Sequence, residues 1–372
     1  MKIPLIDLVR QYNPIKEEIG SAVRAVLEKG VFILGENVEN LECEMASYCG
    51  TRYAVAVANG TDALELSLKA LGIGKGDEVI TTPFTFIATV EAICANSAKP
   101  VLVDIEEETY NINPSLIEKK INSRTKAIIP VHLFGNPCDM DSIMSIAAKY
   151  GLKVIEDCAQ SIGAEFNSRK VGGFAEAGCF SFFPTKNLGC YGDGGMIAVN
   201  SKGTADRIRA LRVHGQTGRY IHEFEGRNSR LDELQSAILR VKMKYLDNYN
   251  ELRRKNARLY DSFFKDSDLV SGLVTPTEPK GRKHVYNIYS IRVKKRDELK
   301  DFLAEREIAA AIYYPVPLHL QKVYGSLGYK KGDLPVSEKV SGDILALPVF
   351  PELEEEEIRF VAKNILEFLR RG

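Results

Sequence analysis

Between Tyr53 and Asn200, short apolar runs rich in β-branched residues alternate with stretches of helical spacing. Several runs are apolar on nearly every residue rather than on alternate residues, which indicates strands covered on both faces. Helical patterns such as TDALELSLKALG and DMDSIMSIAAKYG separate the earlier runs. This alternation predicts an α/β large domain with a mostly parallel, seven-stranded sheet. The seven runs are YAVAVAN, DEVITTP, KPVLVDI, TKAIIPVHL, LKVIEDC, CFSFFP and GMIAVN.

Beyond Asn200 the pattern changes. Residues 231–264 contain no Pro or Gly and are apolar at roughly helical spacing, which predicts one long helix, with a bend allowed. A Pro- and Gly-containing loop follows, and then strand, helix, extended and helical patterns. We therefore expect a large domain over 1–245, including the N-terminal segment, and a smaller C-terminal α+β domain over 246–372. The long helix would join them.

Charge and composition argue against several classes of protein. Lys plus Arg equals Asp plus Glu at 50 each, so no net field favours nucleic acid or an anionic membrane. No apolar run approaches the ~20 residues that span a bilayer, and MKIPLIDLVRQY lacks the apolar core of a signal peptide. The seven cysteines form no C-x-x-C pair, so neither a disulfide framework nor a zinc knuckle is predicted. The expected compartment is the reducing cytoplasm.

Two polar residues stand where apolar runs end, at the sheet edge where such folds bind ligands. Lys186 follows a strand run, so burial could lower its pKa and make its amine a nucleophile. Asp157 ends the run KVIED. Alone, such a lysine is usually a surface residue and such an aspartate a cap or turn former. Together they match pyridoxal phosphate (PLP), which needs an amine for a Schiff base and a carboxylate against its pyridine nitrogen.

Further positions fit the same cofactor. Gly60 and Thr61 follow a strand and open a helix, whose first N–H groups can bind a phosphate; an ordinary helix cap is the alternative. Phe86 follows another strand and could stack on a pyridine ring, although core packing is the usual role of such a residue. Gln160, three residues after Asp157, could contact the phenolic oxygen of the cofactor.

The sequence gives less support to nicotinamide, hydrolase or metal chemistry. No P-loop is present, and no G-x-G-x-x-G follows the first strand, which disfavours a nicotinamide-dependent sugar oxidoreductase. A serine hydrolase would need G-x-S-x-G, which is absent. The five histidines lack metal-ligand spacing, so no metal site is predicted. His214 and His319 lie in polar, loop-like contexts and are better candidates for substrate contacts.

Five segments occur in a characteristic order: NGTDAL, PFTFIAT, EDCAQSIGA, SFFPTKNLGCYGDGG and GRNSRLDELQSAIL. With IDLVRQY, FILGENVENLE, YYPVPLHLQ and LPVFPELEEEEI, they make the chain resemble the DegT/DnrJ family of sugar-nucleotide aminotransferases nearly end to end. The resemblance implies the type I fold of PLP enzymes. It also implies Lys186 as Schiff-base lysine and proton carrier, and Asp157 as partner of the pyridine nitrogen. Around the cofactor it implies Gln160, Phe86, Gly60, Thr61 and Ser181.

The resemblance implies partners as well. The active sites would be shared in a homodimer, with Asn228 reaching the phosphate from the neighbouring subunit and Arg230 close to the substrate. His214, Tyr313 and His319 are the other candidate substrate contacts. L-glutamate would give its amine and leave as 2-oxoglutarate, with the cofactor alternating between PLP and pyridoxamine phosphate (PMP). A nucleotide-linked keto sugar would receive the amine, and neither nucleic acid nor membrane is an expected partner.

Lys186 also separates amino transfer from its closest alternative, because a histidine replaces this lysine in the sugar 3-dehydratases of the fold. A catalytically silent regulatory or scaffold protein would be expected to have lost Lys186 or Asp157. The segments YYPVPLHLQ, NSRLD and HGQ resemble enzymes that aminate C3, and predict a UDP-2-acetamido-2-deoxy-3-oxo-glucuronate type of substrate. Many members of that branch have V-H-Y-P where this chain has residues 312–315 as I-Y-Y-P. A dTDP-3-keto-6-deoxyhexose, or a 4-keto sugar, is the alternative.

Overall fold

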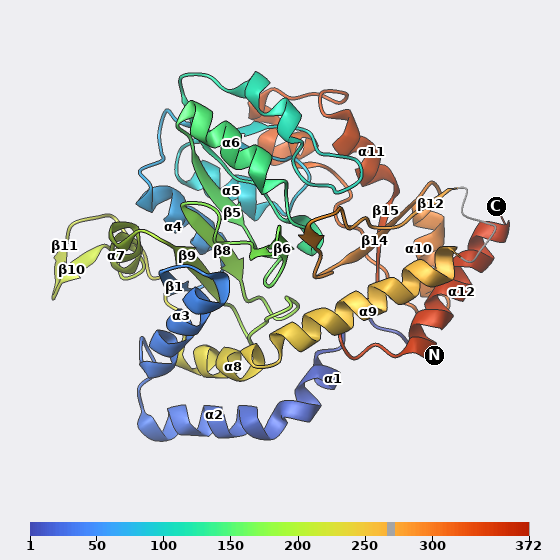
Figure 1. Cartoon of the computed structure of the whole chain (residues 1–372), viewed down its shortest axis with the longest axis horizontal. Coiled ribbons are helices and arrows are strands. Elements are labelled where there is room, and N and C mark those ends of the chain that lie inside the picture. The colour runs from blue at the N-terminus through green and yellow to red at the C-terminus, as the bar shows by residue number, and fades with distance from the viewer. Residues whose placement is uncertain (266–271, 372) are drawn as a thin grey trace.

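The computed structural model describes residues 1–265 and 272–371, and its centre is one seven-stranded sheet (Figure 1). The strand order is β1-β9-β8-β5-β4-β2-β3. Only β9 is antiparallel to its neighbours, so the predicted mostly parallel seven-stranded sheet is confirmed. The strands are β1 (Tyr53–Val57), β2 (Glu78–Thr81), β3 (Lys99–Leu102), β4 (Thr125–Ile128), β5 (Lys153–Asp157), β8 (Ala177–Ser181) and β9 (Gly195–Val199).

Helices cover both faces of this sheet, because alternate residues of a strand point to opposite sides. In β1, Val55 and Val57 pack with α4, α5 and α7, whereas Ala54 and Ala56 pack with α3 and α8. α6 packs over β2, β4 and β5 in a further core. Two-sided burial explains why the runs are apolar on consecutive residues. These helices are α3 (Glu36–Cys49), α4 (Gly60–Ala70), α5 (Ala88–Ala95), α6 (Met140–Tyr150), α7 (Lys202–Leu211) and α8 (Glu233–Met243).

The predicted long helix is two consecutive helices, α8 and α9 (Leu246–Lys265), which separate at residues 244–245. α8 lies against the large sheet, and α9 leads away from it toward the C-terminal part of the chain (Figure 1). There Ala257, Tyr260 and Phe264 pack in the core of a second, smaller sheet. The connection between the two parts of the molecule is therefore helical on both sides of the bend.

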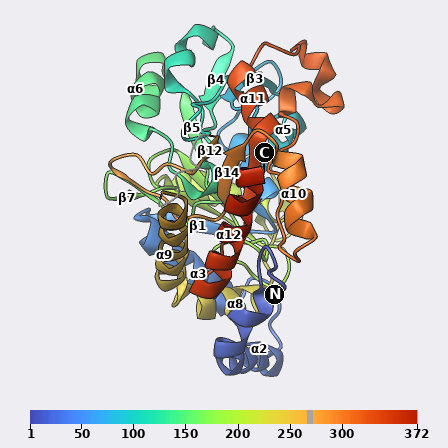
Figure 2. The same cartoon turned by 90° about the vertical axis from the view of Figure 1, so that its right-hand side faces the viewer.

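The smaller sheet is antiparallel and contains β12 (Leu273–Val274), β14 (Tyr289–Val293) and β15 (Ile344–Leu347). α10 (Arg296–Ala304) and α12 (Glu355–Arg371) pack beside it, and Figure 2 shows α12 between α9 and α10. The N-terminus joins this core, since Ile3 pairs with Ile308 and is fully buried. The first residues thus pack with the C-terminal part, whereas the sequence predicts them in the large domain. The boundary at 245/246 itself stays a prediction.

The remaining elements lie at the periphery. α1 (Leu8–Tyr12) and α2 (Lys16–Lys29) carry the chain from the smaller sheet to the outer side of α8. β10 (Gln216–Gly218) and β11 (Ile221–His222) form a hairpin that projects from the body (Figure 1). β6 (Glu165–Phe166), β7 (Arg169–Lys170) and β13 (Arg282–Lys283) form a small sheet, and α11 (Pro335–Asp343) precedes β15. Within the described residues, none of the helices is long and apolar enough to cross a membrane.

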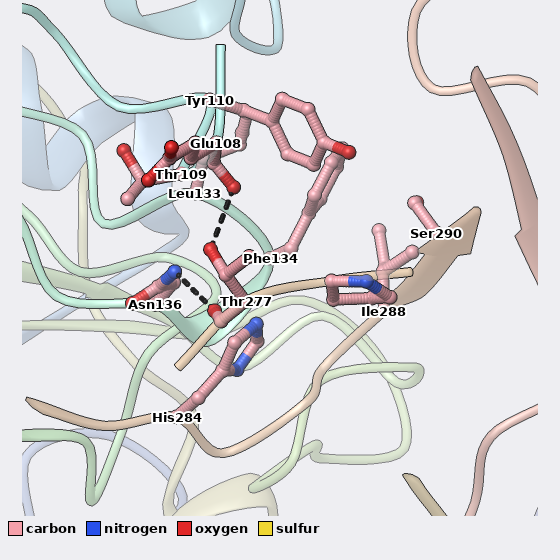
Figure 3. Close-up of a pocket in the computed structure, with 11 residues that line it drawn as sticks. Glu108, Thr109, Tyr110, Leu133, Phe134, Asn136, Thr277, His284, Ile288 and Ser290 are labelled. Carbon is pink, nitrogen blue, oxygen red and sulfur yellow. Dashed lines mark hydrogen bonds between the residues drawn. The ribbon is translucent and has the colours of Figure 1, made fainter. Parts of the chain in front are cut away.

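Thr277 joins the C-terminal part to two loops that follow β3 and β4 of the large sheet. It stands between two partners: its Oγ1 donates to the Glu108 carbonyl at 2.8 Å, and its own carbonyl accepts from Asn136 Nδ2 at 3.1 Å (Figure 3). A cavity of only about 10 Å³ remains beside these contacts. It is too small for a cofactor, so the functional site must lie elsewhere.

Candidate active site

A cavity of about 900 Å³ opens at the carboxyl ends of β1, β8, β5 and β4. Because β9 is antiparallel to both β1 and β8, those two strands point the same way, and their ends meet at one edge. Residues 312–314, residues 346–347 and Val349 of the C-terminal part line another side, together with Leu5 and Ile6. Both ends of the chain thus help to enclose the edge of the sheet where α/β folds bind ligands.

Lys186 lies in the loop after β8, and it lines this cavity. The loop is tightly folded, because the Lys186 N–H donates to the Phe183 carbonyl at 2.9 Å and the Cys190 N–H to the Phe182 carbonyl at 2.8 Å. Burial lowers the pKa of Lys186 to about 8, although the charge of Asp157 opposes this shift. This is the direction expected for a buried amine. A sizeable neutral fraction near neutral pH leaves the amine able to attack a carbonyl group.

Asn187 fixes this loop to distant parts of the chain. Its Nδ2 donates to Asn250 Oδ1 at 2.7 Å and to the Val285 carbonyl at 3.0 Å, and its Oδ1 accepts from Asn287 Nδ2 at 2.9 Å. Asn187 is buried, and Asn287 lines the cavity. The position of Lys186 therefore depends on a buried amide network that includes α9 and the C-terminal part.

Asp157 is the last residue of β5 and is buried at the floor of the cavity. Its Oδ2 accepts from Thr89 Oγ1 at 2.8 Å, and its Oδ1 accepts from the Ala159 N–H at 3.1 Å. Burial raises the pKa of Asp157, whereas these two hydrogen bonds and the charges of Lys186 and His132 lower it. A buried carboxylate held in this way is suited to a cationic partner in the cavity.

Gln160, Phe86, Tyr313 and Tyr314 line the same cavity. Gln160 Oε1 accepts from the Phe134 N–H at 2.7 Å, and Gln160 Nε2 is 3.3 Å from the Tyr314 hydroxyl, so the amide points its donor side to the cavity wall. The Phe86 ring is 57% exposed, with its centroid 6.4 Å from that of Tyr314. An apolar ring left this open beside the cavity is free to cover the face of a flat ligand.

Gly60 opens α4, and the preceding Asn59 caps the helix by accepting from the Asp62 N–H at 2.8 Å. The first-turn N–H groups of Gly60 and Thr61 have no partner within the helix and lie at its positive dipole end. Ser181, at the end of β8, is so close that a Cβ on Gly60 would be 2.7 Å from Ser181 Cβ. Only glycine fits there. Gly60, Thr61 and Ser181 thus form a cradle for an anion such as a phosphate.

The charges that line the cavity are mostly negative. Among the described residues, one lysine, Lys186, stands against Asp62, Asp157 and Asp193. A phosphate, the diphosphate of a sugar nucleotide and the carboxylates of an amino donor are all anions. One copy of the chain supplies few cations to bind them.

The other predicted contacts lie outside this cavity. His214 and Asn228 are exposed beside the β10–β11 hairpin, where Val213 pairs with Asn228, and Arg230 is half-buried nearby. His319 is 2% exposed, with its Nε2 3.0 Å from Glu338 Oε1. The polar sequence around His319 had indicated a substrate contact, but α11 brings Glu338 against its ring. In one copy of the chain, His319 is therefore enclosed by protein and contacts Glu338.

One buried cluster near Asp157 resembles a metal site in composition. His132, Glu156 and Cys158 place their ligand atoms within 4.8 Å of one another. However, His132 Nδ1 accepts from the Cys138 N–H at 3.0 Å, and its Nε2 is 3.2 Å from Glu156 Oε2. The Glu156 carboxylate also accepts from the backbone of Gly172, Phe174 and Ala175. The cluster is therefore explained by its role in holding the backbone of residues 172–175. The absence of a metal site stays a prediction.

Several side chains of the cavity are not predicted from the sequence, among them Thr89 and Tyr314. Thr89 lies one helical turn after Thr85 in PFTFIATVEAI, a spacing that places both hydroxyls on one side of a helix. Nothing in that spacing indicates Asp157, which is 68 positions away in the sequence. Tyr314 is the second residue of the segment YYPVPLHLQ, in which Tyr313 is the predicted substrate contact, and both tyrosines line the cavity.

Comparison with known proteins is consistent with this site. Residues 13–366 match the DegT/DnrJ/EryC1/StrS aminotransferase family. A relative named pleiotropic regulatory protein, from Geobacillus stearothermophilus, is 50% identical over 372 residues, which are 100% of this chain and 99% of the relative. A UDP-N-acetyl-3-dehydro-alpha-D-glucosamine 3-aminotransferase from Acidithiobacillus ferrooxidans is 46% identical, covering 98% of this chain and 97% of its own. A dTDP-3-amino-3,6-dideoxy-alpha-D-galactopyranose transaminase from Aneurinibacillus thermoaerophilus is also 46% identical, covering 98% of each.

Two solved structures match this chain over nearly its whole length. DesV of S. venezuelae, in complex with a ketimine intermediate, superposes with a TM-score of 0.97 at 39% identity, over 100% of this chain and 99% of that one. NtdA of Bacillus subtilis, with bound PMP, superposes with a TM-score of 0.93 at 32% identity, over 99% of this chain and 85% of that one. Both likenesses extend over the whole large sheet and the C-terminal part.

Proposed function

Because the chain belongs to the DegT/DnrJ/EryC1/StrS aminotransferase family, we propose that it transfers the amino group of glutamate to C3 of a nucleotide-linked 3-keto sugar. It is a PLP-dependent aminotransferase of fold type I, as its sequence predicted. The observation that supports amino transfer in this cavity is the meeting of an amine of lowered pKa, a buried carboxylate and an anion cradle, whereas the choice of C3 rests on the sequence motifs and on the names of the relatives.

The residues of the cavity fit PLP. The cradle of Gly60, Thr61 and Ser181 would hold the phosphate, and Asp157 would pair with the ring nitrogen. Phe86 would cover a face of the ring, and Gln160 would donate from Nε2 to the phenolic oxygen. Bound PLP supplies a cationic ring that accepts the electrons left behind when a proton leaves the amino donor.

The chain's own groups would then handle the protons. The half-buried amine of Lys186 has a pKa lowered to about 8, so it could both accept and return a proton near neutral pH. Asp157, held by Thr89 and Ala159, would place a negative charge beside the ring nitrogen and so keep that nitrogen protonated. Residues 312–314, with Leu5 and Ile6, form walls of the cavity and would limit the access of water to this proton transfer.

We further propose that two copies of the chain share their active sites. Among the described residues, a single cavity offers its anionic ligands one cation, Lys186, while Arg230 and Asn228 lie outside it. The nearby hairpin presents Tyr220 and Ile221, which are 81% and 60% exposed, as an apolar surface for a partner. In a homodimer Asn228 would reach the cofactor phosphate and Arg230 the substrate of the other subunit.

This sharing can be tested by complementation. Mixed dimers of Lys186→Ala and Asn228→Ala chains should contain one intact site, and so regain activity that neither variant has alone. If each subunit carries a complete site, refolding the two variants together restores no activity beyond that of the Asn228→Ala chain.

The acceptor is proposed to be UDP-linked, of the 2-acetamido-3-keto type, with the glucuronate form as the sequence-based candidate. One relative that is 46% identical is named for a UDP-linked 3-dehydro sugar and another for a dTDP-linked 3-amino sugar, so a dTDP-3-keto-6-deoxyhexose is the second candidate. A glucuronate carboxylate would need a cation, and Arg230 of a second subunit is the proposed one. His214, Tyr313 and His319 stay candidate substrate contacts.

A substrate panel tests the proposal. The holoenzyme is given glutamate with UDP-linked 3-keto-N-acetylglucosamine, its glucuronate, a dTDP-linked 3-keto-6-deoxyhexose and the matching 4-keto sugars, and 2-oxoglutarate is measured. The highest kcat/KM is expected with a UDP-linked 3-keto sugar. Turnover of 4-keto sugars alone would contradict C3 amination, and loss of water from the sugar without use of glutamate would indicate a dehydratase.

A further inference from the structure

Two buried hydroxyl groups form a chain that ends on Asp157. Thr89 Oγ1 donates to Asp157 Oδ2 at 2.8 Å, and Thr85 Oγ1 lies 3.1 Å from Thr89 Oγ1. All three residues are buried, with 2%, 1% and 4% of Thr85, Thr89 and Asp157 exposed. Thr89 is the second residue of α5, and Thr85 lies in the bend just before this helix, where their hydroxyls meet below the end of β5.

The direction of these two hydrogen bonds follows from the chemistry of Thr85, Thr89 and Asp157. An ionised carboxylate only accepts hydrogen bonds, so the single proton of Thr89 is committed to Asp157. The lone pairs of Thr89 Oγ1 are then free to accept from Thr85, whose proton points the same way. Each hydroxyl polarises the next, which strengthens the final bond to the carboxylate.

We propose that Thr89, supported by Thr85, is a positioning residue that holds Asp157 as an oriented carboxylate for the ring nitrogen of the cofactor. The inference rests on the proposed function. Oδ1 is fixed independently by the Ala159 N–H, so both oxygens have a defined position while Asp157 still lines the cavity. Thr89 would therefore act on the reaction through Asp157 and not by touching the substrate.

Other groups near Asp157 do not replace this donor. The charge of Lys186 acts on Asp157, but its amine would be bonded to the cofactor in the proposed holoenzyme. His132 also faces Asp157, but its ring atoms are engaged by Glu156 and by the Cys138 N–H. Across residues 1–265 and 272–371, Thr89 is the side chain that donates a hydrogen bond to Asp157.

The test compares Thr89→Val, which keeps the shape and removes the hydroxyl, with Thr89→Ser, which keeps the hydroxyl. In Thr89→Val, kcat for amino transfer from glutamate should fall roughly 10- to 100-fold, as expected when a charged group loses a hydrogen bond. KM should change much less. The pH midpoint of the cofactor's visible absorption should move upward, because a less firmly held ring proton no longer repels the proton on the link to Lys186.

Thr89→Ser should stay within about threefold of the wild type in kcat and keep its absorption midpoint, because its hydroxyl can still make the bond. Thr81→Val is the matched control. Thr81 is also fully buried, but its hydroxyl donates to the Ile129 carbonyl at 2.8 Å. This variant can lose stability but should leave the absorption midpoint unchanged. Thr85→Val should shift kcat and midpoint in the same direction as Thr89→Val by a smaller factor, and it carries the test if Thr89→Val does not fold.

A double-mutant cycle decides whether Thr89 acts through Asp157. In an Asp157→Asn background the acceptor is neutral, so Thr89→Val should reduce kcat by a clearly smaller factor than in the wild type. An equal factor in both backgrounds, an unchanged midpoint in Thr89→Val, or a Thr89→Ser variant as impaired as Thr89→Val would overturn the inference. If the wild-type holoenzyme fails to react with glutamate, the proposed function fails instead, and the two failures are distinguishable.

Discussion

The lowered pKa of Lys186 makes a quantitative prediction about cofactor attachment. With an ordinary pKa of 10.5, about 0.03% of the amine would be neutral at pH 7, whereas a pKa of about 8 leaves roughly 9% neutral. The reactive fraction is therefore about 300-fold larger than for an exposed lysine. The rate at which apoenzyme attaches added PLP, followed by absorbance, should rise with pH to a midpoint near 8.

Asp157→Asn tests the cause of this shift. Burial is the larger effect and lowers the pKa of Lys186, while the negative charge of Asp157 raises it. Removing that charge should move the midpoint of attachment further down, below 8. Lys242 provides the control, because burial also lowers its pKa to about 8 although it lies away from the cavity. Borohydride reduction and peptide mapping should find PLP on Lys186 and not on Lys242. A wild-type midpoint near 10.5, or an upward shift in Asp157→Asn, would refute the reasoning.

Three further changes test the site and the packing around it. Gly60→Ala should weaken PLP binding roughly 10- to 100-fold in equilibrium dialysis, because the new Cβ would sit 2.7 Å from Ser181 Cβ. Asn187→Ala should lower the free energy of unfolding in urea by about 2–4 kcal/mol, because it leaves buried amide partners unpaired. Arg10→Ala removes a two-bond ion pair with Glu357 and should cost about 1 kcal/mol after solvent screening at the partly exposed arginine.

The loss of stability in Arg10→Ala should depend on pH. The hydrogen bond from Arg10 holds the pKa of Glu357 below 4.5 in the folded protein, so its stabilisation is present above that pH and is lost as the pH falls through the folded value. Urea midpoints of wild type and Arg10→Ala should converge in acid, and a constant difference would contradict the assignment. Unchanged PLP affinity in Gly60→Ala, or unchanged stability in Asn187→Ala, would likewise show that these contacts are dispensable.

The sheet and the core of the site could be read from the sequence because their signals are local. Each strand is a short apolar run, and Asp157 and Lys186 follow the ends of two runs whose strands, β5 and β8, are neighbours. The carboxyl ends of neighbouring parallel strands lie at one edge of the sheet. Residues that follow such strands in the sequence are therefore predicted to lie close together. Gly60 follows the same logic at β1, whereas Ser181, at the end of β8, was expected only from the family resemblance.

What the sequence did not reveal depends on contacts between distant residues. His319 reads as part of a polar loop, but Glu338 of α11 pairs with its ring and encloses it. Ile3 reads as the start of the large domain, yet it pairs with Ile308 near the other end of the chain. The bond from Thr89 to Asp157 is of the same kind, because it forms only once the start of α5 lies against the end of β5.

The central claim is that this chain is an aminotransferase acting through Lys186, and a single-turnover experiment with glutamate tests it most directly. Holoenzyme mixed with glutamate, without any keto sugar, should convert its cofactor fully to the pyridoxamine form and release one 2-oxoglutarate per active site. Lys186→Ala should release none on the same timescale. A wild-type holoenzyme that binds PLP on Lys186 but leaves glutamate unchanged would contradict the account.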